Sequence, residues 1–171
     1  MFAGDPVWNE ALQETVYEEL AHGRDVALPD DVSLQEGSSN LDVAIWGEQL
    51  VHSYLQQLLR DDDSNVVHVT WMNGATSEQE SGAPYDFMIR VSDPQCEETV
   101  EEYIEVKSTR TDKKAFFEIS SQQFQFAQDT KENFHLYRVF NAGDPTQARL
   151  TKLVNVSKLL DQKQVRLCMV V

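Results

Sequence analysis

Two charged side chains lie in a largely apolar stretch near the middle of the chain, YIEVKS at residues 103–108. If this stretch is a β-strand, Glu105 and Lys107 lie on the same face, about 6.5–7 Å apart along the strand. One interpretation is an ordinary ion pair on a solvated sheet face, which would contribute little to stability. The other is a carboxylate–ammonium pair that can hold a cation and act on water.

A third charged residue, Asp86, begins the strand predicted over 85–92. Asp is uncommon in strands, so Asp86 could simply mark the entry to the strand after the Gly-Ala-Pro turn. Antiparallel pairing of 85–92 with 101–108 would bring Asp86 near Glu105 and Lys107. The pairing therefore predicts two carboxylates and a lysine at one place.

A fourth charged residue, Glu48, lies in the helix predicted over 41–60 and capped by Ser39 or Asn40. Its position on a helical wheel is the centre of the apolar stripe, where a buried carboxylate needs a partner. Alternatively, the helix is apolar nearly all round, and Glu48 reaches solvent at an edge. The predicted stripe consists of Leu41, Ala44, Val51, Leu55 and Leu59.

Two or three carboxylates that meet at one point form an oxygen-ligand site suited to Mg²⁺ or Mn²⁺. A lysine beside them can orient or deprotonate an attacking water and stabilise negative charge on a phosphate. The combination predicts metal-assisted phosphodiester hydrolysis. The four histidines have no zinc-ligand spacing, and the sequence contains no P-loop and no Ser–His–Asp pattern.

The elements that must position these residues follow from the periodicity of the sequence. An acidic N-terminal part, 1–40, is expected to hold a helix and a linker, followed by a domain over 41–171. The helix over 5–22 either packs on the domain or docks a protein partner. The domain has the predicted order helix, three strands, helix, strand and a strand-rich extension. The predicted elements are a helix over 41–60, strands over 65–73, 85–92 and 101–108, and a helix opened by Ser120 or Ser121. A strand over 133–141 follows, and the extension consists of a strand over 148–156, a short helix over 157–162 and a strand over 165–171.

Charge constrains the partners of this chain. Acidic residues outnumber Lys and Arg by 29 to 14, a net charge of −15, and residues 1–40 carry nine acids and one base. Such a charge repels nucleic-acid backbones. A local basic segment nevertheless follows Lys107 and contains Arg110, Lys113 and Lys114. The segment is either a solvated loop or a contact to the phosphate backbone.

The same composition predicts a globular protein inside the cell, in the nucleus or cytoplasm. No apolar run approaches the roughly 20 residues of a membrane helix, and the N-terminus lacks the pattern of a secretory signal. Cys96 and Cys168 are far apart in the sequence and suggest a reducing compartment.

The order αβββαβ with Asp86 and Glu105-Val-Lys107 resembles the PD-(D/E)xK nuclease superfamily, with Pro84 one place early for its Pro-Asp motif. Residues 41–170 more specifically resemble the NO VEIN C-terminal domain family. The matching motifs are Trp46-Gly47-Glu48, Trp71 to Asn73, Gly82 to Asp86, Ile104 to Thr109, Phe117 to Ser120, and Phe124 to Ala127.

This resemblance implies a restriction-endonuclease-like α/β fold with a mixed central sheet. It implies that Glu48, Asp86 and Glu105 hold the metal and that Lys107 is the catalytic lysine. Gln122 or Gln123 would then be a supporting polar residue, at a place where the family often has an acid. Relatives usually carry this domain at the C-terminus of large proteins.

Two functions are therefore expected from the sequence. The first is a Mg²⁺- or Mn²⁺-dependent nuclease that acts on DNA in preference to RNA. The second is a catalytically silent module on the same fold that binds nucleic acid or a protein partner, which the net charge favours. An intact set of acids with a lysine favours the first, because carboxylates that point inward destabilise a pure scaffold.

Overall fold

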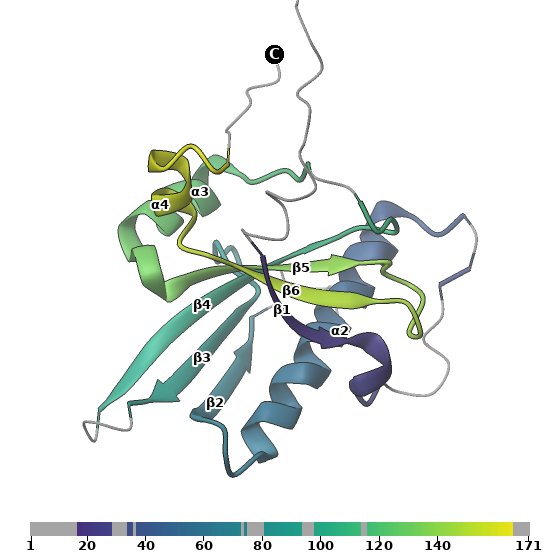
Figure 1. Cartoon of the computed structure of the whole chain (residues 1–171), viewed down its shortest axis with the longest axis horizontal. Coiled ribbons are helices and arrows are strands. Elements are labelled where there is room, and N and C mark those ends of the chain that lie inside the picture. Colours follow the sequence, from purple (N-terminus) through teal and green to yellow (C-terminus); the bar gives the residue numbers. More distant parts are fainter. Residues whose placement is uncertain are drawn as a thin grey trace, which may run out of the picture.

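The computed structural model describes residues 17–28, 34–35, 37–72, 74, 81–93, 98–113 and 116–165 (Figure 1). Cys96, Cys168, Asn73, Lys114 and most of the predicted strand over 165–171 lie outside these residues. The described part is a mixed α/β structure with a curled six-stranded sheet and three α-helices. No helix in this part of the chain is long and apolar enough to span a membrane.

The sheet has the strand order β1-β6-β5-β4-β3-β2. The strands are β1 (Tyr17–His22), β2 (Val66–Trp71), β3 (Phe87–Ser92), β4 (Thr99–Ser108), β5 (Phe134–Phe140) and β6 (Arg149–Val154). Strands β4 and β5 are parallel, and every other neighbouring pair is antiparallel. The predicted helix, three strands, helix and strand over 41–141 are confirmed in that order. The predicted pairing of the second and third strands is confirmed as well, because Phe87 lies opposite Ile104.

Helices cover both faces of the sheet. The long helix α2 (Asn40–Arg60) lies on one face, and α3 (Ser121–Thr130) and α4 (Val156–Asp161) lie on the other, against β5 (Figure 1). Short 3₁₀ turns follow β1, as η1 (Gly23–Asp25), and α3, as η2 (Lys131–Asn133). Each face has its own apolar core, one centred on α2 and one on α3 and α4. The sheet therefore separates two hydrophobic layers.

The start of α2 is fixed by a capping box, as the sequence predicts for Ser39. The Ser39 hydroxyl accepts the Asp42 N–H at 3.2 Å, and the Asp42 carboxylate accepts the Ser39 N–H at 2.7 Å. Arg110 strengthens this end of the molecule by donating to the carbonyl oxygen of Ser38 at 3.0 Å. The helix therefore begins within one residue of its predicted start.

The predicted apolar stripe of α2 is partly wrong. Leu41 and Leu59 are 64% and 37% exposed, whereas Trp46 and Leu50, predicted to lie opposite the stripe, are buried. The buried face is set by contact with β4, where Gly47 lets the two backbones approach closely. A Cβ on Gly47 would lie 2.8 Å from the Ser108 Cβ. The wheel could not resolve this face, because apolar residues surround most of the helix.

The predicted helix over 5–22 is wrong for residues 17–22, which form the edge strand β1. Residues 5–16 lie outside the described part of the chain, so the docking helix stays a prediction there. Antiparallel pairing with β6 places Glu18 opposite Lys152 and gives the β1 backbone its hydrogen-bond partners. These non-local bonds outweigh the helical spacing of the local apolar residues.

Candidate functional site

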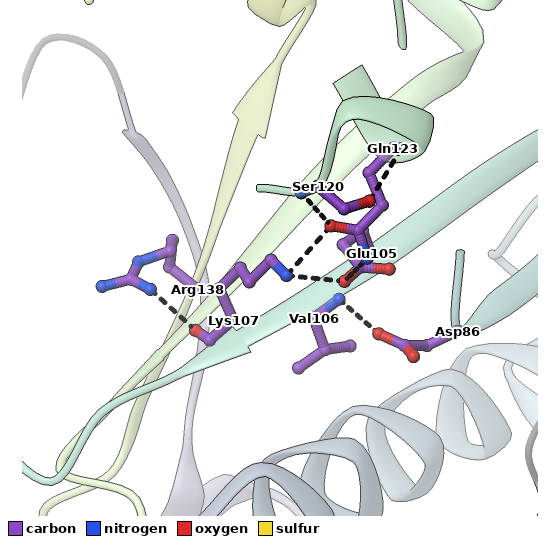
Figure 2. Close-up of polar contacts among 7 residues, drawn as sticks. All are labelled: Asp86, Glu105, Val106, Lys107, Ser120, Gln123 and Arg138. Carbon is purple, nitrogen blue, oxygen red and sulfur yellow. Dashed lines mark hydrogen bonds and ion pairs between the residues drawn. The ribbon is translucent and has the colours of Figure 1, made fainter. Parts of the chain in front are cut away.

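Glu105 and Lys107 lie on the face of β4 opposite α2, next to the start of α3. The Glu105 side chain is buried, with 4% of the residue exposed. Its Oε1 lies 2.8 Å from Lys107 Nζ and accepts a 2.6 Å hydrogen bond from Gln123 Nε2 (Figure 2). The pair is therefore an enclosed ion pair, and the solvated-face interpretation is wrong for it.

Asp86 lies directly before β3 and reaches across to β4. Its N–H donates to the Ile104 carbonyl at 2.9 Å, and its Oδ2 accepts the Val106 N–H at 2.7 Å. These two bonds hold the carboxylate against β4, where its charge acts on the neighbouring Glu105. The hairpin thus brings Asp86, Glu105 and Lys107 together (Figure 2).

The two adjacent carboxyls retain protons more strongly than ordinary carboxyls. Burial, followed by the charge of Asp86, raises the pKa of Glu105 to about 8. Burial likewise raises the pKa of Asp86, against the Val106 N–H and the Lys107 charge, which lower it. A proton on one of the two carboxyls relieves the repulsion between their charges. A cation bound to both would replace that proton.

Glu48 approaches from α2, on the other side of the β-hairpin. It is half-buried, and its Oε2 accepts a 3.0 Å hydrogen bond from Trp71 Nε1. Burial, with the Asp86 charge as the second cause, raises the pKa of Glu48 to about 7. Glu48 therefore lies within the electric field of Asp86, at an edge of the buried face of α2 instead of its centre.

The three acids are not arranged as one ligand cluster. Among the residues that the structure describes, no group of three His, Cys, Asp or Glu side chains is placed to hold a metal ion. Asp86 bonds to Val106, the residue after Glu105, and Glu48 interacts with Asp86 through charge. The chemistry of Asp86 and Glu105 still suits Mg²⁺, which takes one or two carboxylates and keeps several waters.

Gln123 is the supporting residue that contacts the ion pair, and Gln122 is not. Besides its bond to Glu105, Gln123 accepts hydrogen bonds through Oε1 from Lys107 Nζ at 3.2 Å and from the Ser120 N–H at 3.0 Å (Figure 2). Gln122 donates instead to the carbonyl oxygen of Gly82 at 3.3 Å. The S-x-x-Q spacing signals this capping box in the sequence, but not its contact with β4.

Trp71 and Arg138 also contact the predicted site residues. The sequence indicated Trp71 only as part of a family motif, without a site role, and did not indicate Arg138. The indole of Trp71 packs against the rings of His52 and Phe87, at centroid distances of 4.8 and 5.5 Å, and bonds to Glu48. Arg138 is buried and donates to the Lys107 carbonyl at 3.2 Å. Neither contact can be inferred from the local sequence, because each joins residues that are far apart in the chain.

The predicted basic segment is only partly described. Arg110 is exposed, but its guanidinium bonds to the carbonyl oxygens of Ser38 at 3.0 Å and Gln35 at 3.5 Å. Lys113 is exposed as well, and Lys114 lies outside the described residues. Arg110 therefore holds the segment before α2 against the end of β4.

Comparison with known proteins gives one family and one relative. A family model described as "Protein NO VEIN, C-terminal" matches residues 47–152. Protein NO VEIN of Arabidopsis thaliana is 29% identical to this chain over 121 residues. That alignment covers 71% of this chain and 4% of the relative, so the chain spans a small fraction of that protein's length. The matched residues 47–152 include α2 from Gly47 onward, strands β2 to β5, and α3.

Proposed function

This chain belongs to the family of the NO VEIN C-terminal domain, and from that premise we propose that it is a metal-dependent nuclease domain acting on DNA. The observation that carries the proposal is the buried pair Asp86 and Glu105 with Lys107 beside it. A scaffold gains nothing from two neighbouring buried carboxyls, because burial and mutual repulsion both destabilise their charged forms. A divalent cation bound to both carboxylates would offset the burial of their charge and the repulsion between them.

The arrangement of elements supports a restriction-endonuclease-like core for this domain. A helix precedes three antiparallel strands, and a second helix leads to a strand parallel to the third. The proposed site lies at the start of the second strand and the end of the third. This is where the hairpin register brings residue 86 beside 104–106.

Each proposed site residue has a distinct role. Asp86 and Glu105 would hold Mg²⁺ or Mn²⁺, Glu48 would add negative charge beside them, and the metal would supply Lewis-acid stabilisation of the phosphate. Lys107 stabilises the negative charge that develops on the phosphate oxygens. Gln123 holds Glu105 and Lys107 at their separation. The water oxygen forms a bond to phosphorus, the phosphorus–oxygen bond to the leaving nucleotide breaks, and a proton passes to the leaving oxygen.

The basic segment would contact the substrate backbone beside this site. In this proposal Lys113 and Lys114 face phosphates, and Arg110 orders the segment through the Ser38 carbonyl. The segment would supply local positive charge although the chain as a whole has a charge of −15.

A catalytically silent module with the same fold is the second candidate. It is favoured by the net charge and by the binding of the Arg110 guanidinium to the protein's own carbonyl oxygens, which leaves less positive charge for phosphates. Such a module would bind nucleic acid or a protein partner without hydrolysis.

A cleavage assay with two variants tests the proposal. Wild type, Glu105→Gln and Glu101→Gln are incubated with plasmid and with single-stranded DNA in Mn²⁺ or Mg²⁺. Glu101 is the matched control, because it is exposed on the same strand face and pairs with Arg90 at 3.2 Å. We expect wild type and Glu101→Gln to cleave equally, and Glu105→Gln to lose about 100-fold or more. Equal cleavage by all three proteins would place the activity elsewhere, and no cleavage by any would favour the silent module.

A further inference from the structure

Three aromatic rings adjoin the proposed site on the same face of the sheet. Tyr103 lies two residues before Glu105 on β4, and its ring centroid is 4.8 Å from that of Tyr85 and 5.0 Å from that of Phe126. Tyr85, which directly precedes Asp86, is 5.3 Å from Phe126. All three residues are half-buried and pack at the margin of the core on this face. We refer to Tyr85, Tyr103 and Phe126 as the aromatic shelf.

The sheet surface beyond the shelf is open in the described part of the chain. Tyr103 lies opposite Met88 on β3, and Met88 lies opposite Thr70 on β2. All three are half-buried. The described helices on this face, α3 and α4, lie against β5, and α2 lies on the other face (Figure 1). A chain bound at the proposed site can therefore continue over the shelf towards β2.

The charges on this face are poorly suited to a duplex. Duplex binding depends mainly on Lys and Arg that neutralise several phosphates on both strands. Here Arg90 is paired with Glu101 at 3.2 Å, and Lys107 with Glu105 at 2.8 Å. The chain as a whole carries a charge of −15. The two cations named here are therefore neutralised by carboxylates on the same face.

Single strands are bound by stacking their unpaired bases on aromatic rings in addition to charge contacts with the backbone. A duplex buries the faces of its bases within its own stack, whereas a single strand offers them to a protein. We infer that the substrate of the proposed nuclease is a single-stranded nucleic acid, with a base next to the cleaved phosphate stacked on Tyr103 and Tyr85. This inference rests on the proposed function, because it assigns a substrate class to the same site.

Binding without cleavage tests the inference. The Glu105→Gln protein is titrated, in Mg²⁺, into a fluorescein-labelled single-stranded DNA of about 20 nucleotides and into a duplex of the same sequence; this length exceeds the reach of one small binding domain. We expect the single strand to bind at least about tenfold more tightly. Adding Tyr103→Leu should weaken single-strand binding about tenfold and leave duplex binding unchanged. Tyr103→Phe, which keeps the ring, is the matched control and should bind as before.

Duplex affinity equal to or above that of the single strand overturns the inference, as does unchanged binding by a folded Tyr103→Leu protein. If Tyr103→Leu does not fold, Tyr85→Leu and the comparison of the two DNAs decide. The outcomes also separate the two proposals. Tyr103-dependent binding of single strands by a wild type that cleaves neither DNA would refute hydrolysis but retain the substrate class. Glu105-dependent cleavage without single-strand preference would retain the nuclease and refute the substrate class.

Discussion

Gln123 donates a 2.6 Å hydrogen bond from its Nε2 to the Oε1 of Glu105. The other end of the same amide accepts from Lys107 Nζ at 3.2 Å and from the Ser120 N–H at 3.0 Å. With two donors at the oxygen and a carboxylate at the nitrogen, only one orientation of the amide satisfies all three contacts. The Gln123 side chain, which helps to cap the start of α3, therefore also fixes the separation of Glu105, the proposed metal ligand, and Lys107, the proposed catalytic lysine.

Replacing Gln123 should affect both stability and activity. Gln123→Ala removes half of the capping box, which should lower the free energy of unfolding by about 1 kcal/mol. It also removes the contacts to Glu105 and Lys107, and supporting residues of this kind typically change metal affinity or activity by about 10- to 100-fold. Denaturant unfolding and the cleavage rate measure the two effects. Gln122→Ala is the control, because Gln122 contacts Gly82 and not the ion pair; equal losses in both variants would contradict this role.

The pKa values predict how the stability of the metal-free protein depends on pH. The pKa of Glu105 is raised to about 8 and that of Glu48 to about 7, both from an ordinary value of 4.5. Between the ordinary value and the raised values, the folded protein retains protons on Glu48 and Glu105 that the unfolded chain has lost. The free energy of unfolding must therefore fall as pH rises from about 5 to 8. Melting temperatures measured in EDTA across this range should therefore decrease. Glu105→Gln should flatten the decrease and melt higher than wild type at pH 8, and a slope as steep as wild type would contradict the assignment.

Adding a divalent cation should reverse that trend if Asp86 and Glu105 bind it. Within this pH range the two carboxyls are most often ionised at pH 8, where a cation can replace their protons. A ligand that binds only the folded state raises the melting temperature. At 100 times its dissociation constant, Mn²⁺ should stabilise wild type by about 2.7 kcal/mol, or roughly 5–10 °C for a chain of this size. Glu105→Gln should show little shift, whereas Glu101→Gln should match wild type. An equal shift in all three proteins would indicate binding at another place.

The sequence predicts the elements of the core well because their signals are local. The Ser39 cap, the α2 boundaries and the order of strands follow from periodicity and turn residues. The meeting of Asp86 with Glu105 was also predictable, since a hairpin with one register determines it. These features need no knowledge of distant contacts.

The errors concern contacts between distant segments. Residues 17–22 pair with β6, more than 120 positions away in the chain, and this pairing overrides their helical spacing. The choice between Gln122 and Gln123 depended on how α3 rotates against β4, and the buried face of α2 on where Gly47 meets Ser108. The contact between Trp71 and Glu48 was not predictable for the same reason, because the two residues lie on different elements.

The close contact of Gly47 with Ser108 predicts a measurable packing effect. A Cβ at residue 47 would lie 2.8 Å from the Ser108 Cβ, so α2 must move away from β4 in Gly47→Ala. The usual gain from replacing a helical Gly by Ala should therefore be reversed, to a loss of about 1–3 kcal/mol. Adding Ser108→Gly should recover part of the loss by opening space, in a double-mutant cycle measured by denaturant unfolding. Strictly additive effects would show that the two residues do not interfere.

The hydrogen bond from Trp71 to Glu48 predicts a change in titration. This bond stabilises the ionised form of Glu48, opposing the burial that raises its pKa to about 7. Trp71→Phe keeps an aromatic ring beside His52 and Phe87 but removes the N–H donor, so the Glu48 pKa should rise further. Carboxyl-carbon NMR can follow this titration without any assay of activity. If Glu48 assists metal binding, cleavage at pH 7 should fall by about two- to tenfold and recover at higher pH, because one pKa unit corresponds to a tenfold change in ionisation. Thr70→Val, on the opposite face of β2, is the control, and an unchanged Glu48 pKa in Trp71→Phe would show that the bond does not form in solution.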